Sequence, residues 1–351
     1  MSWQTGYSGA GDQGSRDANS DITRVTDKYS YATTPEMRKL IAAELLNNSE
    51  NRPISRQFLP DLAELATHES ERDDPIGDDA HSPLPGLIHR YPDRVLVKLL
   101  EQCAVYCRFC FRREEVGGSH PPISDAQFSA MCDYIAARPA LHEVILSGGD
   151  PLILSPRRLA VIQQKIAAIP HIDILRLHSR VPVVAPERIT AEVLTALRPK
   201  NSKLAVYIMI HANHASEFSD AAGDALARLV DHGIILLGQS VLLRGVNNDV
   251  NALSDLFRTM LRHRITPHYL HHPDLARGTA HFRLSITEGQ ALMQQLRGRI
   301  SGLAVPHYML DIPGGFGKVP LTPNYALYSG QDWKITDPKG QKHHYVDDVL
   351  L

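Results

Sequence analysis

The stretch that decides the fold is RVLVKLLEQCAVYCRFCFRR, residues 94–113. Its first part, Val95–Leu100, is a short apolar run with the length of a buried strand. Cys103, Cys107 and Cys110 follow it within eight residues. Cysteine thiolates hold iron–sulfur clusters, and three of them from one loop leave one iron of a four-iron cluster without a protein ligand. The spacing therefore predicts a cluster with an open iron, where chemistry can take place.

Two other uses of the cysteines stay open. A structural zinc site closes with four ligands, and Cys132 could be the fourth, but residues 125–137 have the pattern of an amphipathic helix. A disulfide framework is disfavoured because four cysteines in 351 residues, without a signal peptide, indicate a reducing compartment. We expect Cys132 to be a small buried apolar residue.

The composition indicates a globular protein that acts on a small molecule or makes a local protein contact. A chain of 351 residues can form one large α/β domain with extensions, or two average domains. The formal net charge of −2 gives no electrostatic footprint for nucleic-acid binding. No apolar stretch reaches the roughly 18 residues of a membrane span, and the first residues lack a secretion signal. We therefore expect a cytoplasmic protein with no nucleic-acid or membrane partner.

Four parts follow one another along the chain. Residues 1–30, rich in Gly, Ser, Asp and Asn, predict a flexible arm. Residues 31–90 predict a helical extension, whose first helix begins after the N-cap Thr34. Residues 91–312 alternate between strand and helix patterns, and residues 313–351 hold a glycine-rich loop and a short polar tail.

The alternation from residue 94 onward predicts a parallel sheet. The expected strand and helix pairs are Val95–Leu100 with Asp125–Ala137, Glu143–Ser147 with Pro156–Ile169, Asp173–His178 with Thr190–Leu197, Leu204–Ile210 with Asp220–Asp231, Ile234–Leu243 with Val250–Arg262, and Thr266–His271 with Thr287–Leu296, before a last strand at His307–Asp311. Six or seven such units come close to a barrel or an incomplete one. The chemistry of these barrels takes place at the C-terminal ends of the strands.

Polar clusters follow several of these strands. The run SGGD at residues 147–150 contains paired glycines, which let a backbone approach a ligand closely or make an ordinary turn. His178–Arg180 and His211–His214 follow the next two strands. A single histidine pair without a companion cysteine or carboxylate favours a structural or substrate-contacting role over metal binding.

The late segment DIPGGFGK, residues 311–318, ends in a single lysine. It is not a P-loop, because the spacing is wrong and Val319 replaces the required Ser or Thr. A lysine at the end of a close-approach loop at a barrel mouth could form a Schiff base with an aldehyde cofactor. The alternative is a solvated surface lysine.

Together these motifs resemble the lysine 2,3-aminomutase family of radical S-adenosylmethionine (SAM) enzymes. The resemblance runs from about residue 86 to residue 325. It rests, in order, on HRYPDR at 89–94, the CxxxCxxC loop with Arg112 and Arg113 behind it, SGGDPL at 147–152, QSVLLRGVN at 239–247, Asp274 within HPDL, and PGGFGK at 313–318. It implies an α/β fold, an incomplete (β/α)6-type radical SAM barrel, and an isomerase that converts L-lysine to β-lysine.

The resemblance also implies three cofactors. Cys103, Cys107 and Cys110 would ligate a [4Fe–4S] cluster, and SAM would chelate its open iron. The residues that would contact SAM are Ser147, Gly148, Gly149, Asp150 and Gln239. Lys318 would bind pyridoxal 5′-phosphate (PLP) covalently as the catalytic lysine. The residues that would surround the PLP phosphate are Arg90, Tyr91 and Arg94.

The substrate contacts implied by the resemblance involve three charged residues. Arg112 would pair with the α-carboxylate, because a guanidinium fork suits that planar anion. Asp274 and Asp311 would hold the distal ammonium, since a buried ammonium must be paired. Taken alone, Asp274 reads as a turn residue and Asp311 as a strand-end cap.

The chain departs from the family pattern near its C-terminal end. No cysteine follows Lys318, so the zinc site of full-length lysine aminomutases is not expected, and the assembly, including a homo-oligomer, stays open. The short build resembles the branch that makes β-lysine for translation elongation factor P, whereas Asp311 and the PGGFGK run are closer to the free-lysine enzymes.

Other functions also stay open. The chain could be a related enzyme that acts on another amino acid. It could also be a cluster-bearing electron carrier, but such a protein would have no use for Lys318 as a Schiff-base lysine. The expected partners are L-lysine and an electron-donor protein such as flavodoxin or ferredoxin.

Overall fold

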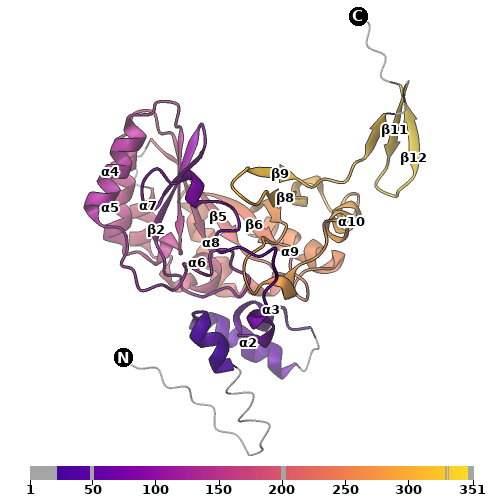
Figure 1. The fold of residues 1–351 in the computed structure, drawn as a ribbon, viewed down its shortest axis with the longest axis horizontal. Coiled ribbons are helices and arrows are strands. Elements are labelled where there is room, and N and C mark those ends of the chain that lie inside the picture. Colours follow the sequence, from indigo (N-terminus) through magenta and orange to yellow (C-terminus); the bar gives the residue numbers. More distant parts are fainter. Residues whose placement is uncertain (1–21, 48–50, 199–202, 329, 331, 347–351) are drawn as a thin grey trace, which may run out of the picture.

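The computed structural model describes residues 22–47, 51–198, 203–328, 330 and 332–346. Its centre is a curled sheet of nine strands that follow one another in sequence order (Figure 1). The parallel strands are β2 (Arg94–Leu100), β3 (Glu143–Gly148), β4 (Ile174–Ser179), β5 (Ala205–His211), β6 (Ile235–Val241), β7 (Thr266–His271) and β8 (His307–Asp311). Their sequential order confirms the predicted incomplete (β/α)6 barrel.

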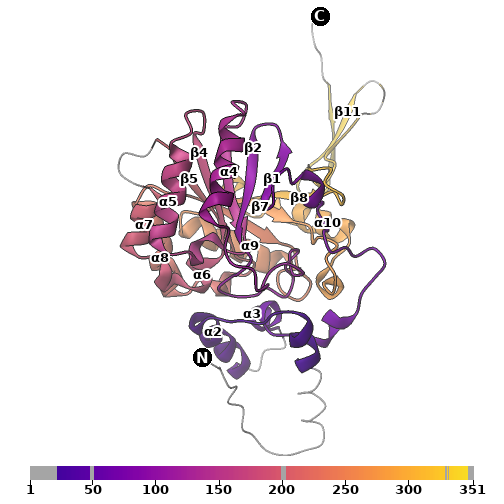
Figure 2. The same ribbon diagram turned by 60° about the vertical axis from the view of Figure 1, so that its left-hand side comes forward.

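Helices connect the parallel strands and cover the outside of the sheet (Figure 2). They are α4 (Asp125–Ala136), α5 (Pro156–Ala167), α6 (Val181–Val184), α7 (Ala191–Leu197), α8 (Asp220–Asp231), α9 (Val250–Arg262) and α10 (Ile286–Leu296). Short 3₁₀ turns are η1 (Leu62–Leu65), η2 (Asp79–His81), η3 (Pro151–Ile153), η4 (Pro186–Arg188), η5 (Ala215–Glu217), η6 (Ala280–Phe282) and η7 (Gly302–Ala304). Ser or Thr hydroxyls cap several of the helices, such as Ser124 before α4 and Ser285 before α10.

The core lies between the sheet and these helices. Strand β3 carries four consecutive buried residues, as a strand covered on both faces should. Helix α9 contributes one buried apolar face, including Leu253, Leu256, Phe257 and Met260. None of the helices in the described part of the chain is long and apolar enough to cross a bilayer.

The two edges of the sheet were not expected as strands. β1 (Leu87–Tyr91) pairs antiparallel with β2, and β9 (Lys318–Pro320) pairs antiparallel with β8. Both edge strands therefore join the barrel across the predicted boundaries at residues 90 and 312. β1 has only two consecutive apolar residues and β9 has three residues in all, so no apolar run marked them.

An N-terminal group of helices lies against one end of the barrel (Figure 1). α2 (Pro35–Leu46) begins after its N-cap Thr34, as predicted, and α3 (Pro53–Phe58) follows. Of the expected arm, residues 1–21 lie outside the described residues, while residues 22–28 are helical and Val25 is buried. The packed chain therefore starts before the predicted boundary at residue 30.

The C-terminal segment contains a sheet of its own. β10 (Ala326–Tyr328), β11 (Trp333–Thr336) and β12 (Lys342–Tyr345) form three antiparallel strands that project from the barrel (Figures 1 and 2). Most of their side chains are exposed, so the sequence lacks the alternation of a half-buried strand. Because the tail is polar, this sheet could not be predicted from the sequence.

Candidate active site

One cavity of about 280 Å³ lies at the C-terminal ends of the parallel strands. All the site residues predicted from the sequence line it: Arg90, Tyr91, Arg94, Cys103, Cys107, Cys110, Arg112, Ser147, Gly148, Gly149, Asp150, Gln239, Asp274, Asp311 and Lys318. They come from the edge strand β1, the cysteine loop after β2, and the ends of later strands. The fold thus gathers residues that are more than two hundred positions apart in the sequence.

The cysteine loop follows β2 and is held from outside by the N-terminal segment. The backbone N–H of Tyr106 donates to the carbonyl of Ala32 at 3.1 Å, and that of Arg108 donates to the carbonyl of Gln57 at 2.9 Å. These bonds fix the loop between the barrel and the N-terminal helices. The three cysteine thiols therefore face the cavity from a braced backbone.

The cysteine thiols are in a low-polarity environment. Burial, with smaller contributions from neighbouring acidic groups, raises the pKa of Cys103 well above its usual value, and burial raises the pKa of Cys110 to about 11. Iron would reverse this preference, because metal binding deprotonates its thiol ligands. Three thiols at one end of a cavity, with no fourth cysteine lining it, fit the donor set of an open cluster.

No group of three or more His, Cys, Asp or Glu side chains within the described residues is arranged to hold a single metal ion. The histidine pair of the sequence is also divided: His211 lines the cavity, whereas His214 caps η5 through its Nδ1 atom. Cys132 lies on α4 and packs against the core, but it is only partly buried, whereas a buried residue was predicted.

The paired glycines after β3 let two backbones meet. Gly148 has a φ of 111°, and a Cβ atom there would lie 2.4 Å from the carbonyl oxygen of Leu100. A Cβ at Gly149 would lie 1.9 Å from the carbonyl oxygen of Gln102. Both glycines are thus required because the turn after β3 lies very close to the start of the cysteine loop. From the sequence, the glycines could have served either a ligand contact or an ordinary turn.

Asp150 fastens this turn to the next strand. One carboxylate oxygen accepts from the Leu152 N–H at 3.0 Å and the Ser179 hydroxyl at 2.7 Å. The other accepts from the N–H groups of Arg180 at 2.7 Å and Val181 at 3.2 Å. Burial raises the pKa of Asp150 and these hydrogen bonds lower it, with a net upward shift. Its direct contact with SAM stays a prediction, since its oxygens already have partners.

Arg180 is a buried residue that the predicted site did not include. Its Nη1 donates to the sulfur of Cys107 at 2.8 Å, and its Nη2 donates to Gln57 Oε1 and Glu217 Oε2, both at 2.6 Å. Burial lowers its pKa, but Cys107 and Glu217 raise it more. Its position directly after a predicted strand was the available signal, and the sequence could not reveal its three partners.

Lys318 and Asp311 form an ion pair that also lines the cavity. Lys318 Nζ lies 2.5 Å from both carboxylate oxygens of Asp311, on the neighbouring strand β8. His271 Nδ1 lies 3.4 Å from the same carboxylate. Burial alone would raise the pKa of Asp311. His271 and Lys318 together lower this pKa by more than burial raises it, so the net shift is downward. Asp311 is therefore held as a carboxylate.

Asp274 has the opposite charge preference. Burial and the neighbouring Asp311 raise its pKa to about 7, although Lys318 and Arg112 lower it. Two carboxylates that share a site cannot both ionise easily, so Asp274 holds its proton up to about pH 7. This pair would suit a cationic side chain entering the cavity.

A second carboxylate bridge organises the arginines. Asp78 accepts from Arg112 Nη2 at 2.8 Å through one oxygen and from Arg90 Nη2 at 3.0 Å through the other. Arg112 also approaches the Ser147 hydroxyl at 3.4 Å. Asp78 lies in a Pro- and Asp-rich connector, and no sequence pattern distinguishes it from its acidic neighbours. It fixes two predicted anion-binding residues relative to each other.

The structure fits an anionic group beside Lys318. The Nε atom of Arg90 is buried without a hydrogen-bond partner in this structure, and the guanidinium of Arg94 stacks 3.9 Å from the ring centroid of Tyr91. The Tyr91 hydroxyl accepts from the backbone N–H of Lys318 at 3.1 Å. Lys318 and the predicted phosphate-binding residues are therefore adjacent, as the predicted PLP site requires.

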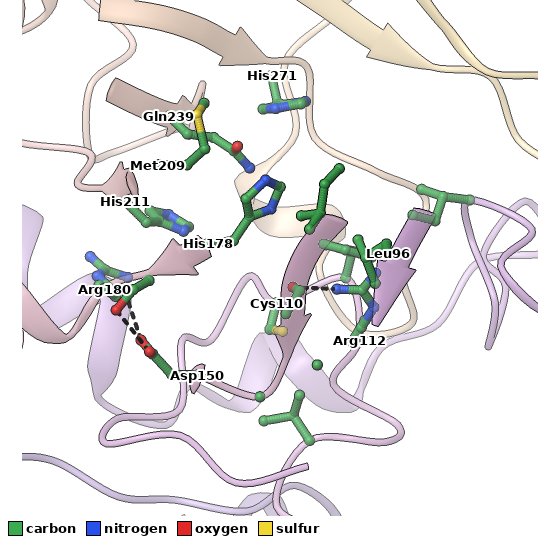
Figure 3. A pocket seen from close by; sticks show the side chains of 18 of the residues that line it. Leu96, Cys110, Arg112, Asp150, His178, Arg180, Met209, His211, Gln239 and His271 are labelled. Carbon is green, nitrogen blue, oxygen red and sulfur yellow. Dashed lines mark hydrogen bonds between the residues drawn. The ribbon is translucent and has the colours of Figure 1, made fainter. Parts of the chain in front are cut away.

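Several polar side chains lie along this cavity wall, beside Arg176. Figure 3 shows His178, His211, Gln239 and His271 along this wall. Burial, followed by nearby arginines, holds the pKa values of His178 and His211 well below the usual range, so both rings are neutral at pH 7. The Nε2 atoms of His178 and His271 are buried without partners. They are available to a polar ligand such as SAM that spans the cavity.

Comparison with known proteins gives a consistent group of relatives. A family model described as lysine-2,3-aminomutase matches residues 293–336. The chain is 38% identical over 306 residues to L-lysine 2,3-aminomutase of Acetoanaerobium sticklandii, covering 87% of this chain and 72% of that protein. It is 35% identical over 312 residues to glutamate 2,3-aminomutase of Clostridioides difficile, covering 89% and 72%.

Among solved structures, the chain is similar to a radical SAM methyltransferase from Sphaerobacter thermophilus. The TM-score is 0.43 at 19% identity, covering 64% of this chain and 68% of the other.

Proposed function

Because the chain belongs to the lysine 2,3-aminomutase family of radical SAM enzymes, we propose that it moves the α-amino group of L-lysine to the β-carbon and so forms β-lysine. The cofactors of this reaction would be a [4Fe–4S] cluster, SAM and PLP. When bound, they supply radical generation from SAM and stabilisation of the migrating nitrogen, which side chains alone cannot provide. The protein supplies binding, orientation and shielding.

The observation that carries the proposal is the shared cavity of the three cysteines and Lys318. A cluster alone would serve electron transfer, and a Schiff-base lysine alone would serve many amino-acid reactions. Because they line one cavity of about 280 Å³, a cluster on the cysteines would face an amino acid held by PLP on Lys318.

Three sets of side chains would bind the substrate and PLP. Arg90, Arg94 and Tyr91 would hold the phosphate. Arg112, oriented by Asp78 at 2.8 Å, would pair with the substrate α-carboxylate. Asp274 and Asp311 would receive the distal ammonium. Asp311 would become free for it when Lys318 Nζ joins PLP, because Lys318 now occupies that carboxylate.

A second candidate is the glutamate reaction of the Clostridioides difficile relative. The charge of the cavity argues against it, because a glutamate carboxylate would face the ionised Asp311 and would raise the pKa of Asp274 further. We keep formation of β-lysine for elongation factor P as an alternative use of the same chemistry. Glutamate turnover above lysine turnover would favour the second candidate.

Three further features belong to this proposal. An electron-donor protein such as flavodoxin or ferredoxin would reduce the cluster. A cytoplasmic location would keep the cysteines reduced for iron binding. A homo-oligomer is compatible with the exposed C-terminal sheet, on which Leu327 and Tyr328 are 51% and 63% exposed.

The test is an anaerobic assay of the reconstituted protein with SAM, PLP and a panel of amino acids, read by mass spectrometry. We expect β-lysine from L-lysine, and no product from glutamate. Borohydride reduction should leave a pyridoxyl adduct on Lys318, and the matched variant Lys318→Arg should carry none. An adduct-free Lys318 in the PLP-loaded wild-type protein would contradict the proposal.

A further inference from the structure

We propose that Arg180 raises the reduction potential of the cluster through its hydrogen bond to Cys107, and that Gln57 and Glu217 hold it in place. The inference rests on the cluster assigned to the cysteine loop in the proposed function. It concerns the chain's own side chains around one cluster ligand. Arg180 would act through Cys107, so it is a positioning residue.

The geometry leaves Arg180 a single orientation. Its side chain is 5% exposed, and its Nη2 atom is shared between Gln57 and Glu217, which are both fully buried. The guanidinium lies 4.5 Å from the ring centroid of Phe58. The Nη1 donor lies on the sulfur of Cys107 at 2.8 Å, at the wall of the cavity.

The carboxylate beside Arg180 has other donors. Glu217 accepts from Gln57 Nε2 at 3.0 Å, from the Asn213 N–H at 2.8 Å and from the His214 N–H at 3.0 Å. Its negative charge is therefore spread over several partners, and the guanidinium is not fully neutralised by it. A net positive potential reaches the sulfur of Cys107.

A hydrogen bond and a positive charge at a ligand sulfur favour the reduced cluster. Reduction adds one electron, here from a one-electron donor of the flavodoxin or ferredoxin class, and makes the cluster more negative. Hydrogen bonds to sulfur, net charge and burial are the terms by which a protein sets such potentials. Among the described contacts, Cys107 is the cluster cysteine with a side-chain donor, so the effect is concentrated on one ligand.

Gln57 links this effect to the N-terminal helices. It belongs to α3, and its backbone carbonyl also accepts from the Arg108 N–H in the cysteine loop. One residue outside the barrel therefore fixes both the loop and the arginine that contacts it. The N-terminal segment would thus help to set the electronic property of the cluster.

The test compares the midpoint potentials of reconstituted variants without SAM, measured by redox titration with electron paramagnetic resonance. Arg180→Gln should make reduction about tenfold less favourable, which for one electron is about 59 mV. Arg180→Lys should fall between Arg180→Gln and the wild type, because it keeps the charge but cannot span three partners. Gln57→Glu should also lower the potential, because its carboxylate would draw the guanidinium from the sulfur.

Arg264→Gln is the matched control, since Arg264 is a half-exposed arginine paired with Asp231. It should leave the potential unchanged. Wild-type potentials in cluster-loaded Arg180→Lys and Gln57→Glu would overturn the inference, even if Arg180→Gln failed to fold. A wild-type chain that took up no cluster would overturn both this inference and the proposed function. Shifted potentials without lysine turnover would support the inference and contradict only the substrate.

Discussion

Asp274 and Asp311 have similar surroundings but different charge states. Asp311 is paired with Lys318 and ionised, whereas the pKa of Asp274 is raised to about 7 by burial and by Asp311. Loss of the Asp274 proton and departure of Lys318 from Asp311 would together leave two carboxylates for one cationic group. The pair is therefore prepared for an ammonium group on a substrate.

The raised pKa of Asp274 predicts a pH-dependent cost in stability. The folded chain binds this proton more tightly than the unfolded chain, so stability falls as pH rises from about 4 to about 7. Asp274→Asn keeps a neutral group and removes that cost. We expect the variant to gain stability relative to the wild type at pH 8 compared with pH 5, by about 1 kcal/mol or more, in denaturant unfolding of the cofactor-free protein.

The control for this prediction is Asp231→Asn, which changes an exposed carboxylate on the outer surface. Its stability difference from the wild type should be the same at both pH values. An Asp274→Asn difference that did not change between pH 5 and pH 8 would mean that Asp274 is ionised throughout.

The turn after β3 keeps its shape only because Gly148 and Gly149 have no Cβ atoms. Gly149→Ala would place a Cβ atom 1.9 Å from the Gln102 carbonyl oxygen, so the start of the cysteine loop must move. Overpacking of this kind costs roughly 1 to 3 kcal/mol. We expect lower stability and a lower iron content per chain after anaerobic reconstitution, measured by unfolding and by iron analysis.

Gly302→Ala provides the comparison, because no atom lies within 4 Å of the position of its added Cβ. Iron content and stability should stay close to the wild type in this variant. Equal iron content in Gly149→Ala and the wild type would show that the loop can move without losing the metal.

The predictability of each element depended on how much of it is buried. The parallel strands and their helices were found because β3 and α9 carry continuous or periodic apolar residues. β10 and β12 have only exposed residues. They are held by backbone hydrogen bonds, which require no apolar pattern in the sequence. The edge strands β1 and β9 are set by pairing with distant partners, which no local pattern contains.

At the scale of the whole molecule, a buried ionic cluster joins the N-terminal segment to the barrel. Glu64, which is fully buried, accepts from Arg108 Nε at 2.9 Å and also pairs with Arg113. Arg108 donates to the carbonyl of Ser30 at 2.9 Å as well. The cysteine loop thus has charged anchors on the side away from the cavity.

Glu64→Gln should be strongly destabilising, because it leaves two buried guanidinium groups without their carboxylate. Breaking one partner of a buried ion pair costs about 3 to 5 kcal/mol. Denaturant unfolding measures this loss. The exposed ion pair of Asp231 and Arg264 is the matched control, and Asp231→Asn should cost less than about 1 kcal/mol. Similar costs for both variants would refute the anchoring role of Glu64.

Motif residues were predictable from sequence, and the residues that orient them were not. Lys318 and the cysteines carry distinctive chemistry at distinctive spacing. Asp78 contacts a residue 34 positions away in the sequence, and Arg180 contacts one 73 positions away. Neither stands in a sequence pattern that distinguishes it from other charged residues. Long-range pairing of this kind requires the fold before it can be recognised.

The hydrogen bond from the Lys318 N–H to the Tyr91 hydroxyl connects edge strands 227 residues apart. It has a consequence for the order of events during protein synthesis. The cysteine loop leaves the ribosome about two hundred residues before Lys318, so a nascent chain can acquire its iron ligands long before it has a cofactor-binding lysine. Chains arrested before β9 would lack the lysine and the bond that closes the barrel's open side. PLP could therefore bind covalently only after β9 has been synthesised, whereas the iron ligands are available earlier.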